Sequence, residues 1–457
     1  MAKTLYICYF GVREPLVQTQ VLPYLRELVM SDSESWDAGR DACDPVEVSL
    51  LTFEPAEEVV EKGRKGEREE GRRRDREKEF AVIREKLANE GIEWNWLPYH
   101  KRPSALATAW DVICGAWFVW RRIGEFDILH GRVHVATLMA AVARKFSRRK
   151  PKILFDIRGF FPEEYVDAGI WKEGSTIFRL AKRVERWLMK EADGFVVLTE
   201  RAREILFGTR NAECGMWNPS DMAGEDDPRS SIRNPQSNGP VEVIPCCVDF
   251  ARFENADSET RAGMRAKLGI GDRPVLVYVG AFGGWYLTDE MADLFAAFKT
   301  FAPDGFAMIL TQSDIKQIEL KLIANGYSKD DFFIAKVDSS EIPGYLCAAD
   351  IAVSLIKPCY SKLASSPTKN AEYLACGLPI IANAEIGDVD ELILQNGIGT
   401  LITEFSRDAY IKAINEIQAL GDISERCRET ARREFDLETV GGVRYRRLYK
   451  KILHRDD

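Results

Sequence analysis

Short apolar runs alternate with longer amphipathic segments along most of the chain. Runs of strand length in the first half occupy residues 5–10, 46–52, 92–97, 127–130, 152–156, 195–198 and 241–244. Segments with helical spacing lie between them, notably 17–30, 135–146 and 177–191. Such alternation is typical of a parallel, doubly wound α/β sheet. The pattern therefore predicts one α/β domain in residues 1–248.

The same alternation begins again in the second half. Apolar runs occupy residues 275–279, 307–311, 332–335, 351–355 and 378–382, and a helical pattern at 288–300 follows the first of them. A chain of 457 residues also exceeds what one hydrophobic core usually serves. We therefore predict a second α/β domain at 249–435 and a final helical segment at 436–457.

Two stretches interrupt this regular pattern. Residues 57–86 mix charges of both signs, which favours a solvated helix over the alternative of a surface that docks on an anionic membrane. Residues 208–240 are rich in Gly, Ser, Asn, Pro and Asp and lack periodicity. They predict a mobile surface insertion.

The composition narrows the class of protein. A net charge of −9 argues against a general nucleic-acid binder, because neutralisation of phosphates supplies most of such affinity. The ten cysteines have no regular framework, which predicts reduced thiols in a cytoplasmic protein. The N-terminus lacks the layout of a signal peptide, and no apolar stretch reaches the roughly 18 residues of a membrane-spanning helix.

The most apolar stretch, residues 105–120, is interpreted as a half-buried helix. Its tryptophans lie beside Arg121 and Arg122, however, and this combination would also suit a helix at a membrane interface. Peripheral contact with a membrane surface is therefore kept as an alternative for this stretch.

The stretch 361–391 carries the strongest signal for a ligand site. Its hydroxyl residues and Pro367 predict the start of a short helix, Gly377 predicts its end, and residues 378–382 predict a buried strand behind it. The start of a helix carries free backbone N–H groups and a partial positive charge, which suit a phosphate. The residues expected to bind a nucleotide here are Ser365, Ser366, Thr368, Lys369, Asn370 and Glu372.

Two side chains of this group have specific roles. Lys369 adds a full positive charge in the first turn, and Glu372 is placed to accept hydrogen bonds from the hydroxyls of a ribose. The alternative is a purely structural helix with Glu372 as a surface carboxylate. Asp388 and Asp390 form an Asp-x-Asp pair before another helix, so we interpret them as capping residues and expect no metal site.

The segment Glu372-Tyr373-Leu374-Ala375-Cys376-Gly377-Leu378-Pro379 resembles the donor-binding segment of retaining GT-B glycosyltransferases, in particular family 4. Gly387 and Glu391 follow where that family commonly carries a glycine and a glutamate. The family's first glutamate is Ala364 here, as in a subset with a Ser-Ser-Pro-x-Lys run. The resemblance implies two Rossmann-like domains facing each other across a cleft, with a last helix that crosses back to the first domain.

The resemblance also places Gly280 in a donor-binding loop and Tyr345 beside the nucleobase. The family usually offers an arginine and a lysine from that loop to the diphosphate, but this chain has Ala281 and, near the lysine's place, Trp285-Tyr286. The charge of the leaving group must then be met by other cations. The available cations are Lys369, Lys362 and Arg158.

Loops after the strands of the first domain should face the shared cleft, because ligands bind at the carboxyl ends of parallel strands. Gly11 permits close approach of a ligand to the backbone, and Arg13 could meet a phosphate or an acidic acceptor. His130 or Arg132 could occupy the place of the family's histidine at the donor sugar. The predicted catalytic residues are His130, Arg132, Arg158 and Lys369, with Gly11 on the donor side and Arg13, Asp156 and Arg158 on the acceptor side.

The preferred hypothesis is a metal-independent, retaining glycosyltransferase that moves a sugar from a nucleotide-diphosphate sugar, of UDP type, to a glycan or lipid-linked acceptor. By resemblance it would serve cell-envelope polysaccharide synthesis in the cytoplasm or at the inner face of the membrane, without a cofactor. The alternatives are a nucleotide-sugar epimerase of the same architecture and a non-catalytic nucleotide-sugar-binding subunit. An epimerase needs a cluster of carboxylates and histidines in the cleft, and the sequence does not single one out.

Overall fold

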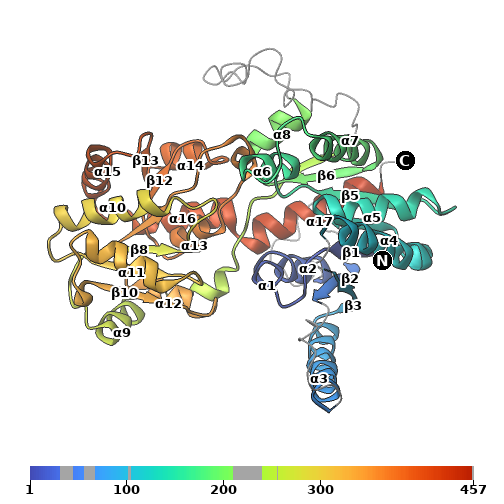
Figure 1. Ribbon diagram of the computed structural model, residues 1–457, viewed down its shortest axis with the longest axis horizontal. Coiled ribbons are helices and arrows are strands. Elements are labelled where there is room, and N and C mark those ends of the chain that lie inside the picture. The colour runs from blue at the N-terminus through green and yellow to red at the C-terminus, as the bar shows by residue number, and fades with distance from the viewer. Residues whose placement is uncertain (31–44, 56–66, 101–103, 209–238, 255, 455–457) are drawn as a thin grey trace.

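The computed structural model describes residues 1–30, 45–55, 67–100, 104–208, 239–254 and 256–454. The insertion predicted at 208–240 lies almost entirely outside this part of the chain, as do residues 57–66 of the charged stretch. The described residues form two α/β lobes that lie side by side (Figure 1). Each lobe has one parallel sheet with apolar clusters on both of its faces.

Seven parallel strands build the first sheet, in the order β3-β2-β1-β4-β5-β6-β7. Their bounds are β1 Ala2–Cys8, β2 Val46–Pro55, β3 Ile92–Tyr99, β4 Ile128–Arg132, β5 Lys152–Asp156, β6 Gly194–Val197 and β7 Val241–Val243. The central strands are buried on both faces, which is why they appear in the sequence as continuous apolar runs. Each run predicted in the first half contributes one strand.

The helices of the first lobe connect these strands. Their bounds are α1 Pro15–Gln20, α2 Leu22–Val29, α3 Glu67–Asn89, α4 Ser104–Arg122, α5 Val133–Lys145, α6 Phe161–Asp167, α7 Thr176–Glu191 and α8 Glu200–Phe207. The single helix predicted at 17–30 was wrong, because the chain breaks at Val21 into α1 and α2. Pro23 explains the break, since its ring excludes the helical carbonyl one turn earlier and it has no N–H group to donate.

Six parallel strands build the second sheet, in the order β10-β9-β8-β11-β12-β13. Their bounds are β8 Val275–Val279, β9 Phe306–Leu310, β10 Phe332–Ala335, β11 Ile351–Ser354, β12 Ile380–Asn383 and β13 Gly399–Ile402. The helices are α9 Ser258–Leu268, α10 Thr288–Phe301, α11 Ile315–Ala324, α12 Ile342–Cys347, α13 Thr368–Ala375, α14 Val389–Asn396, α15 Arg407–Ala419 and α16 Ser424–Phe435. The sequence patterns missed β13, because Gly399 and Thr400 interrupt its apolar run. Two doubly wound sheets confirm the predicted pair of Rossmann-like domains.

The last helix, α17 Val443–Leu453, packs on the first lobe after a π-helical turn, η8 Leu437–Gly442. Figure 1 shows it in red, reaching from the left lobe into the right lobe, where both chain ends lie. The hydroxyl group of Tyr449 lies 2.8 Å from His130 Nδ1 on β4 and 3.2 Å from Thr4 Oγ1 on β1. The C-terminal segment therefore ties the two lobes together.

A short segment before α13 forms part of the joint between the lobes. This segment is η7 Tyr360–Ala364, and its Leu363 and Ala364 are buried in an apolar cluster of the first lobe. The backbone carbonyl of Leu363 accepts a hydrogen bond from Thr199 Oγ1, at the start of α8, at 2.9 Å. Ala364, which stands where the resembled family carries its first glutamate, is thus packed against the first lobe.

The Asp388 carboxylate also contributes to this joint. It accepts hydrogen bonds from the backbone N–H groups of Glu200 at 2.7 Å and Arg201 at 3.2 Å, both in the first turn of α8. Its side chain does not cap α14, the helix that it precedes. The prediction that it caps its own helix was therefore wrong, and the reason is that the start of α8 from the other lobe lies closer to the carboxylate.

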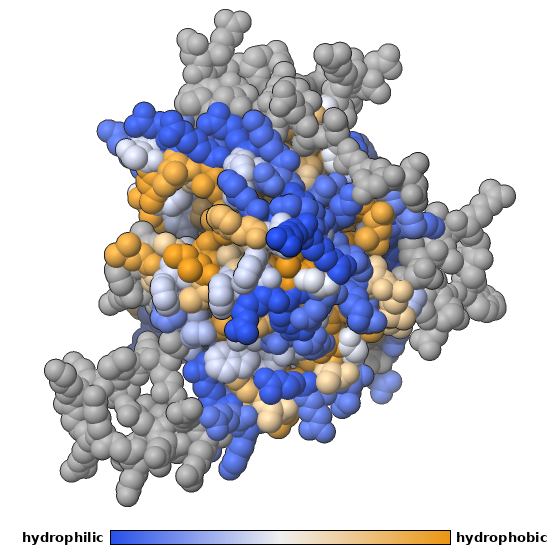
Figure 2. Space-filling view, turned by 90° about the vertical axis from the view of Figure 1, so that its right-hand side faces the viewer, coloured by the Kyte–Doolittle hydropathy of each residue, from blue (hydrophilic) through white to orange (hydrophobic). Residues whose placement is uncertain are grey.

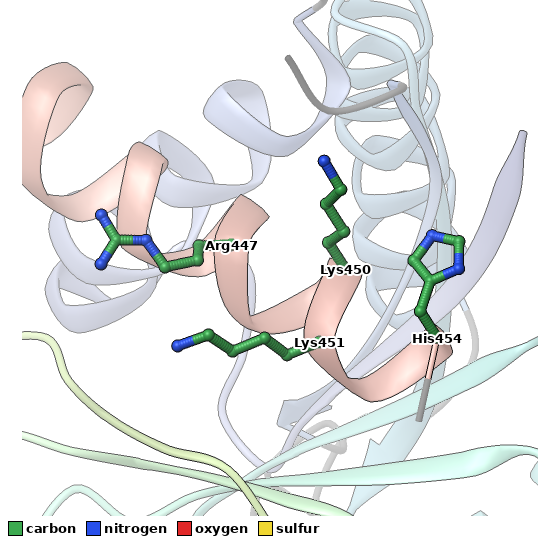
Figure 3. Close-up of a pocket in the computed structure, with 4 residues that line it drawn as sticks. All are labelled: Arg447, Lys450, Lys451 and His454. Atoms are coloured by element: carbon green, nitrogen blue, oxygen red, sulfur yellow. The ribbon is translucent and has the colours of Figure 1, made fainter. Parts of the chain in front are cut away.

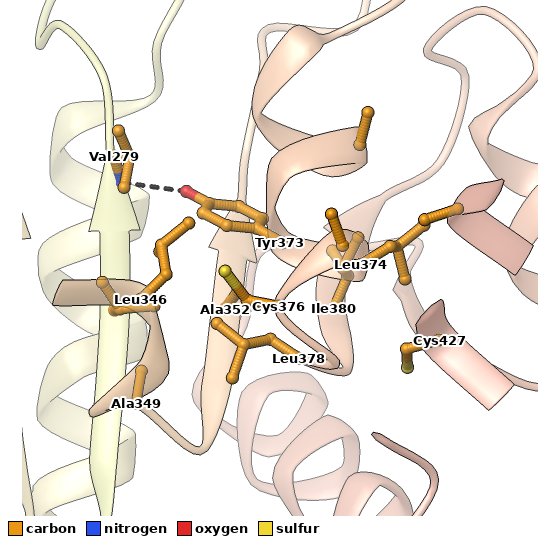
Figure 4. Packing of buried hydrophobic residues seen from close by; sticks show 14 of the residues in the cluster. Val279, Leu346, Ala349, Ala352, Tyr373, Leu374, Cys376, Leu378, Ile380 and Cys427 are labelled. Carbon is orange, nitrogen blue, oxygen red and sulfur yellow. Dashed lines mark hydrogen bonds between the residues drawn. The ribbon is translucent and has the colours of Figure 1, made fainter. Parts of the chain in front are cut away.

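Helix α13 is anchored in the core of the second lobe. Tyr373 is fully buried, and its hydroxyl group accepts a hydrogen bond from Val279 N–H at 2.8 Å, as Figure 4 shows. The same hydroxyl group donates to the Val353 carbonyl at 3.2 Å. Because β8 and β11 are both held by this one side chain, α13 has a fixed place beside their carboxyl ends.

We expect Tyr449→Phe to lower the free energy of unfolding by about 1–3 kcal/mol, because buried His130 Nδ1 would lose its partner. Tyr410→Phe is the matched control. Tyr410 is equally buried, but its hydroxyl group has no hydrogen-bond partner among the described residues, so its removal should cost close to nothing. Urea denaturation followed by circular dichroism measures both, and equal losses in the two variants would contradict the anchoring role.

Candidate active site

The predicted donor segment lies where the strand order of the second sheet reverses. Strands β8 and β11 are neighbours, with β9 beyond the first and β12 beyond the second. Gly280 follows β8 directly, and α13 follows β11 through η7. Ligands of doubly wound sheets bind at such a switch point, at the carboxyl ends of the strands.

At this point the ammonium group of Lys369 lies against the rings of Tyr278 and Tyr286, which together form an aromatic box. Its Nζ lies 4.5 Å from the ring centroid of Tyr278 and 4.3 Å from that of Tyr286. It also lies 3.5 Å from the Tyr278 hydroxyl group. A Cβ added to Gly280, whose φ is +143°, would lie 3.4 Å from this nitrogen. The structure thus brings together Lys369 and Gly280, which the sequence analysis placed in one donor site.

The charge of Lys369 has no counter-ion among the described residues. No carboxylate of this part of the chain forms a salt bridge with it, although only 8% of the residue is exposed. Burial lowers the pKa of Lys369 to about 7. Cation–π contacts offset part of the desolvation cost, but an anion bound beside the ammonium group would offset more of it.

The first turn of α13 offers polar groups next to Lys369. No side chain caps the helix, whose N-cap position is Pro367. Asn370 is 2% exposed, and neither its amide nitrogen nor its amide oxygen has a hydrogen-bond partner among the described residues. Buried polar groups without partners are rare and costly, so this turn is suited to bind a polar ligand.

Glu372 lies one turn further along α13 and is paired with Arg252. Its Oε1 is 3.4 Å from Arg252 Nη1, and Arg252 Nη2 donates to the Ser339 carbonyl at 2.6 Å. Burial raises the pKa of Glu372, against the lowering effect of Arg252. The sequence analysis missed Arg252. Its place three residues after Asp249, where the chain enters the second domain, gave no indication that it reaches α13.

The loop before α13 is packed against both lobes. Ser366 Oγ accepts a hydrogen bond from Cys246 N–H at 3.1 Å, whereas Ser365 and Thr368 are half-buried. Gly387, with φ of +50°, passes so close that an added Cβ would lie 2.0 Å from the Ser365 carbonyl oxygen. Only glycine fits at this crossing, and the close approach fixes the loop that leads into the first turn of α13.

Four predicted residues of the first lobe form one enclosed network. Asp156 Oδ2 accepts hydrogen bonds from Arg158 Nε at 2.9 Å and from the Tyr445 hydroxyl group at 3.0 Å. The same oxygen lies 3.6 Å from both His130 Nε2 and Arg132 Nη1. The structure brings these strand-end residues together beneath α17, to which Tyr445 belongs. Their contact with a substrate stays a prediction.

In this network one carboxylate, that of Asp156, faces the guanidinium groups of Arg132 and Arg158. Burial alone would raise the pKa of Asp156, but Arg158, His130 and Arg132 hold it below its usual range. Burial lowers the pKa of His130 in spite of the neighbouring carboxylate. The network is suited to hold α17 on the ends of β4 and β5.

The remaining predicted residues lie outside the Lys369 box. Gly11 passes against the buried Glu54, whose Oε1 accepts a hydrogen bond from Val12 N–H at 2.7 Å. Arg13 is half exposed and pairs with Glu79 of α3 at 2.7 Å. The Tyr345 ring is buried and stacks on Phe333, with ring centroids 5.5 Å apart. The ligand contacts expected of Gly11, Arg13 and Tyr345 stay predictions.

Two surface hollows lie away from this site. One is lined by Arg447, Lys450, Lys451 and His454 at the end of α17, and Figure 3 shows these side chains pointing in different directions. The other lies at the C-terminal end of α13, beside Cys376 and Gly377. Charged side chains, among them Arg261, Asp350 and Arg428, line the second hollow, but it lies at the opposite end of α13 from Lys369.

No three His, Cys, Asp or Glu side chains of the described residues come close enough together to hold a metal ion. The Asp-x-Asp pair has other partners. Asp388 caps α8, and Asp390 accepts a hydrogen bond from Glu385 N–H at 3.1 Å and pairs with Arg201 at 3.2 Å.

Two models of known protein families match the chain, one in each lobe. Residues 42–213 match the glycosyl transferase 4-like domain, and residues 261–434 match the glycosyl transferases group 1. These matches indicate a glycosyltransferase of the GT-B, family-4 type. The donor segment described above lies within the second match.

The chain is similar to one characterised relative and to several solved structures. A GDP-mannose-dependent phosphatidylinositol monomannoside mannosyltransferase from Mycolicibacterium smegmatis is 25% identical over 185 residues, which are 39% of this chain and 47% of the relative. The alignment thus spans about half of the relative's length.

Sucrose-phosphate synthase from Thermosynechococcus elongatus has a TM-score of 0.65 at 14% identity, with both chains covered completely. Anabaena HepE in complex with UDP and glucose has a TM-score of 0.62 at 14% identity, covering 98% of this chain and 100% of HepE. At this low sequence identity, these structures show only that the chain shares their fold.

The aromatic box was not predicted, although the sequence contains a signal for it. Tyr278 is the penultimate residue of a buried strand, two residues before Gly280, and Tyr286 lies near the end of the loop that begins there. Both tyrosines thus flank the glycine-rich loop in the sequence, but only the structure shows that the Lys369 ammonium group lies against their rings.

We expect binding of a nucleotide diphosphate at pH about 8 to take up about one proton, because the anion raises the pKa of Lys369 from about 7 toward its ordinary value. Calorimetry in buffers of different ionisation enthalpy measures the uptake. Near pH 6 the group is already protonated and the uptake should vanish. Lys369→Met removes the titrating group, so binding by this variant should be independent of the buffer. Buffer-independent binding by the wild type would contradict the placement of the anion.

Proposed function

We propose that the chain transfers a sugar from a nucleotide-diphosphate sugar to a glycan or lipid-linked acceptor, with retention of configuration and without a metal ion. The observation that carries the proposal is the pair of groups on one face of the α13 start. Lys369 presents an unpaired ammonium group to the Gly280 loop, and Glu372 presents a carboxylate one turn further on. A diphosphate and the ribose attached to it need these two groups in this order.

Lys369 takes the place of the loop cations usual in family 4. In this chain the arginine's place is Ala281, and Tyr286 lies near the lysine's place. Tyr286 instead forms one wall of the box around the ammonium group. The positive charge therefore reaches the same loop from α13, so the leaving diphosphate can be neutralised there.

Charge stabilisation of the diphosphate is the main catalytic effect in this proposal. The Lys369 ammonium group and the uncapped start of α13 are fixed before the reaction, and they lie in a site with little exposure to water. Such preorganised positive charge is worth more in a dry site than in solution. In the front-face mechanism usual for this type of enzyme, the leaving phosphate oxygen takes the proton of the acceptor.

Arg252 completes the ribose side of the site. It pairs with Glu372 and reaches the carbonyl of Ser339 after β10, so it connects α13 to the strand edge where a nucleobase would lie. We propose that Glu372 accepts hydrogen bonds from ribose hydroxyls while Arg252 holds its orientation. The Asn370 amide would gain the hydrogen bonds that it lacks.

The proposal of a UDP-type donor rests on one protein of similar fold. Anabaena HepE has been solved with UDP-glucose, whereas the mannosyltransferase relative is GDP-mannose-dependent by its name. Metal independence is supported by Asp388 and Asp390, because their carboxylates accept hydrogen bonds from backbone N–H groups. A role in cell-envelope polysaccharide synthesis, at the inner face of the membrane, completes the proposal.

Donor hydrolysis followed by proton NMR tests the reaction without a known acceptor. With UDP-glucose and GDP-mannose as probes and a chelator present, we expect release of the nucleoside diphosphate and, first, of the α-anomer of the sugar. The chelator tests metal independence, and the first anomer tests retention. Isomerised nucleotide sugar without release of the diphosphate would indicate the epimerase instead. Binding without either change would indicate the non-catalytic subunit.

We expect Glu372→Ala to raise the donor's KM roughly tenfold to a hundredfold, because ribose hydroxyls in a buried site would lose their partner. Glu372→Gln keeps the shape of the side chain and one acceptor oxygen, so its effect should be smaller. The melting temperature of each variant, measured without nucleotide, controls for the loss of the Arg252 pair. Donor kinetics that match the wild type in Glu372→Ala would refute the ribose contact.

A further inference from the structure

Helix α4 exposes a continuous apolar stripe. Its members follow one another at helical spacing on a single face and are 41–72% exposed: Leu106, Trp110, Ile113, Trp117 and Trp120. The opposite face packs on the first lobe through Ala107, Ala116 and Val119. Monomeric proteins rarely expose such a patch without a partner for it.

The stripe continues beyond the end of the helix. Trp120 Nε1 donates a hydrogen bond to the Phe146 carbonyl at 3.1 Å, and the Phe146 side chain is 74% exposed. Trp117 and Trp120 stack on each other, with ring centroids 5.3 Å apart. The apolar surface therefore extends from α4 onto the turn that follows α5.

Basic side chains border this surface on the side of Phe146. The exposed ones are Arg121, Lys145, Arg148, Arg149 and Lys150. Residues 104–155 contain nine basic and three acidic residues. Of the acidic ones, Asp111 is fully buried, whereas Glu125 pairs with Arg122 and Asp127 pairs with Arg149. A chain with a net charge of −9 thus carries a local excess of positive charge beside its exposed tryptophans.

A second basic row lies on the neighbouring helix. Helix α7 packs on α5 and exposes Arg179, Arg183, Arg186 and Lys190 at helical spacing. Lys145 Nζ lies 5.8 Å from the ring centroid of Trp187, so the two basic groups are adjacent. Figure 2 shows this end of the molecule, with hydrophobic residues gathered at the left and hydrophilic residues around them.

We infer that this surface, the α4 stripe with its basic border, binds an anionic lipid bilayer. Tryptophan and aliphatic side chains would enter the interface between headgroups and acyl chains, while the arginines and lysines would contact the phosphates. No helix among the described residues is long and apolar enough to cross a membrane, so α4 would lie along the bilayer surface. The charge complementarity favours an anionic bilayer over a second copy of this acidic chain. The inference does not depend on the proposed sugar transfer.

Co-sedimentation of the full chain with lipid vesicles tests this inference. We expect binding to vesicles that contain phosphatidylglycerol to be at least about tenfold tighter than binding to pure phosphatidylcholine, and to weaken as salt is added. Quenching of the wild-type tryptophan emission by brominated acyl chains reports insertion without any variant. Donor hydrolysis is assayed separately without vesicles, so failure of one proposal does not affect the other.

Matched variants locate the contact. Leu106→Glu with Ile113→Glu should weaken binding to anionic vesicles at least about tenfold, because it places two charges in the stripe. Leu320→Glu with Leu394→Glu is the control, since these side chains of α11 and α14 are 68% and 72% exposed, compared with 72% and 60% for the tested pair. The control should bind as the wild type does.

Arg148→Ala with Lys150→Ala should remove most of the preference for anionic lipid, because each basic group near the surface adds affinity for it. Circular dichroism verifies that each variant is folded. The inference is overturned if the full chain does not bind anionic vesicles or if the control loses as much as the tested pair. It is also overturned if sedimentation velocity shows a dimer that Leu106→Glu with Ile113→Glu separates, because a second copy would then cover the stripe.

Discussion

The candidate site depends on one buried positive charge, the ammonium group of Lys369. An isolated buried charge is costly, and here two tyrosine rings and a hydroxyl group are its partners in place of a carboxylate. Tyr373 joins α13 to β8 and β11, so the backbone from which the lysine side chain extends has a fixed place. A site that keeps an unpaired cation in place is prepared for an anion.

The joint between the lobes places a second constraint on the same region. Leu363 and Ala364 are buried against the first lobe, and Asp388 caps α8 across the joint. Both segments flank the loop that leads into α13. Movement of one lobe relative to the other would expose these apolar side chains and remove the cap. The predicted donor segment is therefore linked mechanically to the first lobe, to which the sequence analysis assigned the acceptor-side residues.

The sequence was sufficient for the features that local patterns determine. The strand runs, the short helix at Thr368–Ala375 and its glycine end all follow from residue types at fixed spacing. The sequence was not sufficient where partners lie far apart along the chain. Arg252 meets Glu372 across 120 residues, and Arg158 meets Tyr445 across 287. Which side chains a helix such as α17 covers is decided by tertiary packing, and no local pattern records it.

The absence of the usual loop cations is the most informative departure from the family pattern. A cation on a glycine-rich loop can follow the loop when it moves, whereas a cation on α13 keeps the position of the helix. In this chain the charge proposed for the diphosphate and the carboxylate proposed for the ribose belong to the same helical face, one turn apart. Their spacing is fixed by helix geometry instead of by the fold of a loop. Tyr278 and Tyr286 then only need to shield the ammonium group from water, which aromatic rings do without competing for its charge as a carboxylate would. The replacement of Arg and Lys by Ala281 and Tyr286 is thus compatible with a competent site, provided that Lys369 is retained.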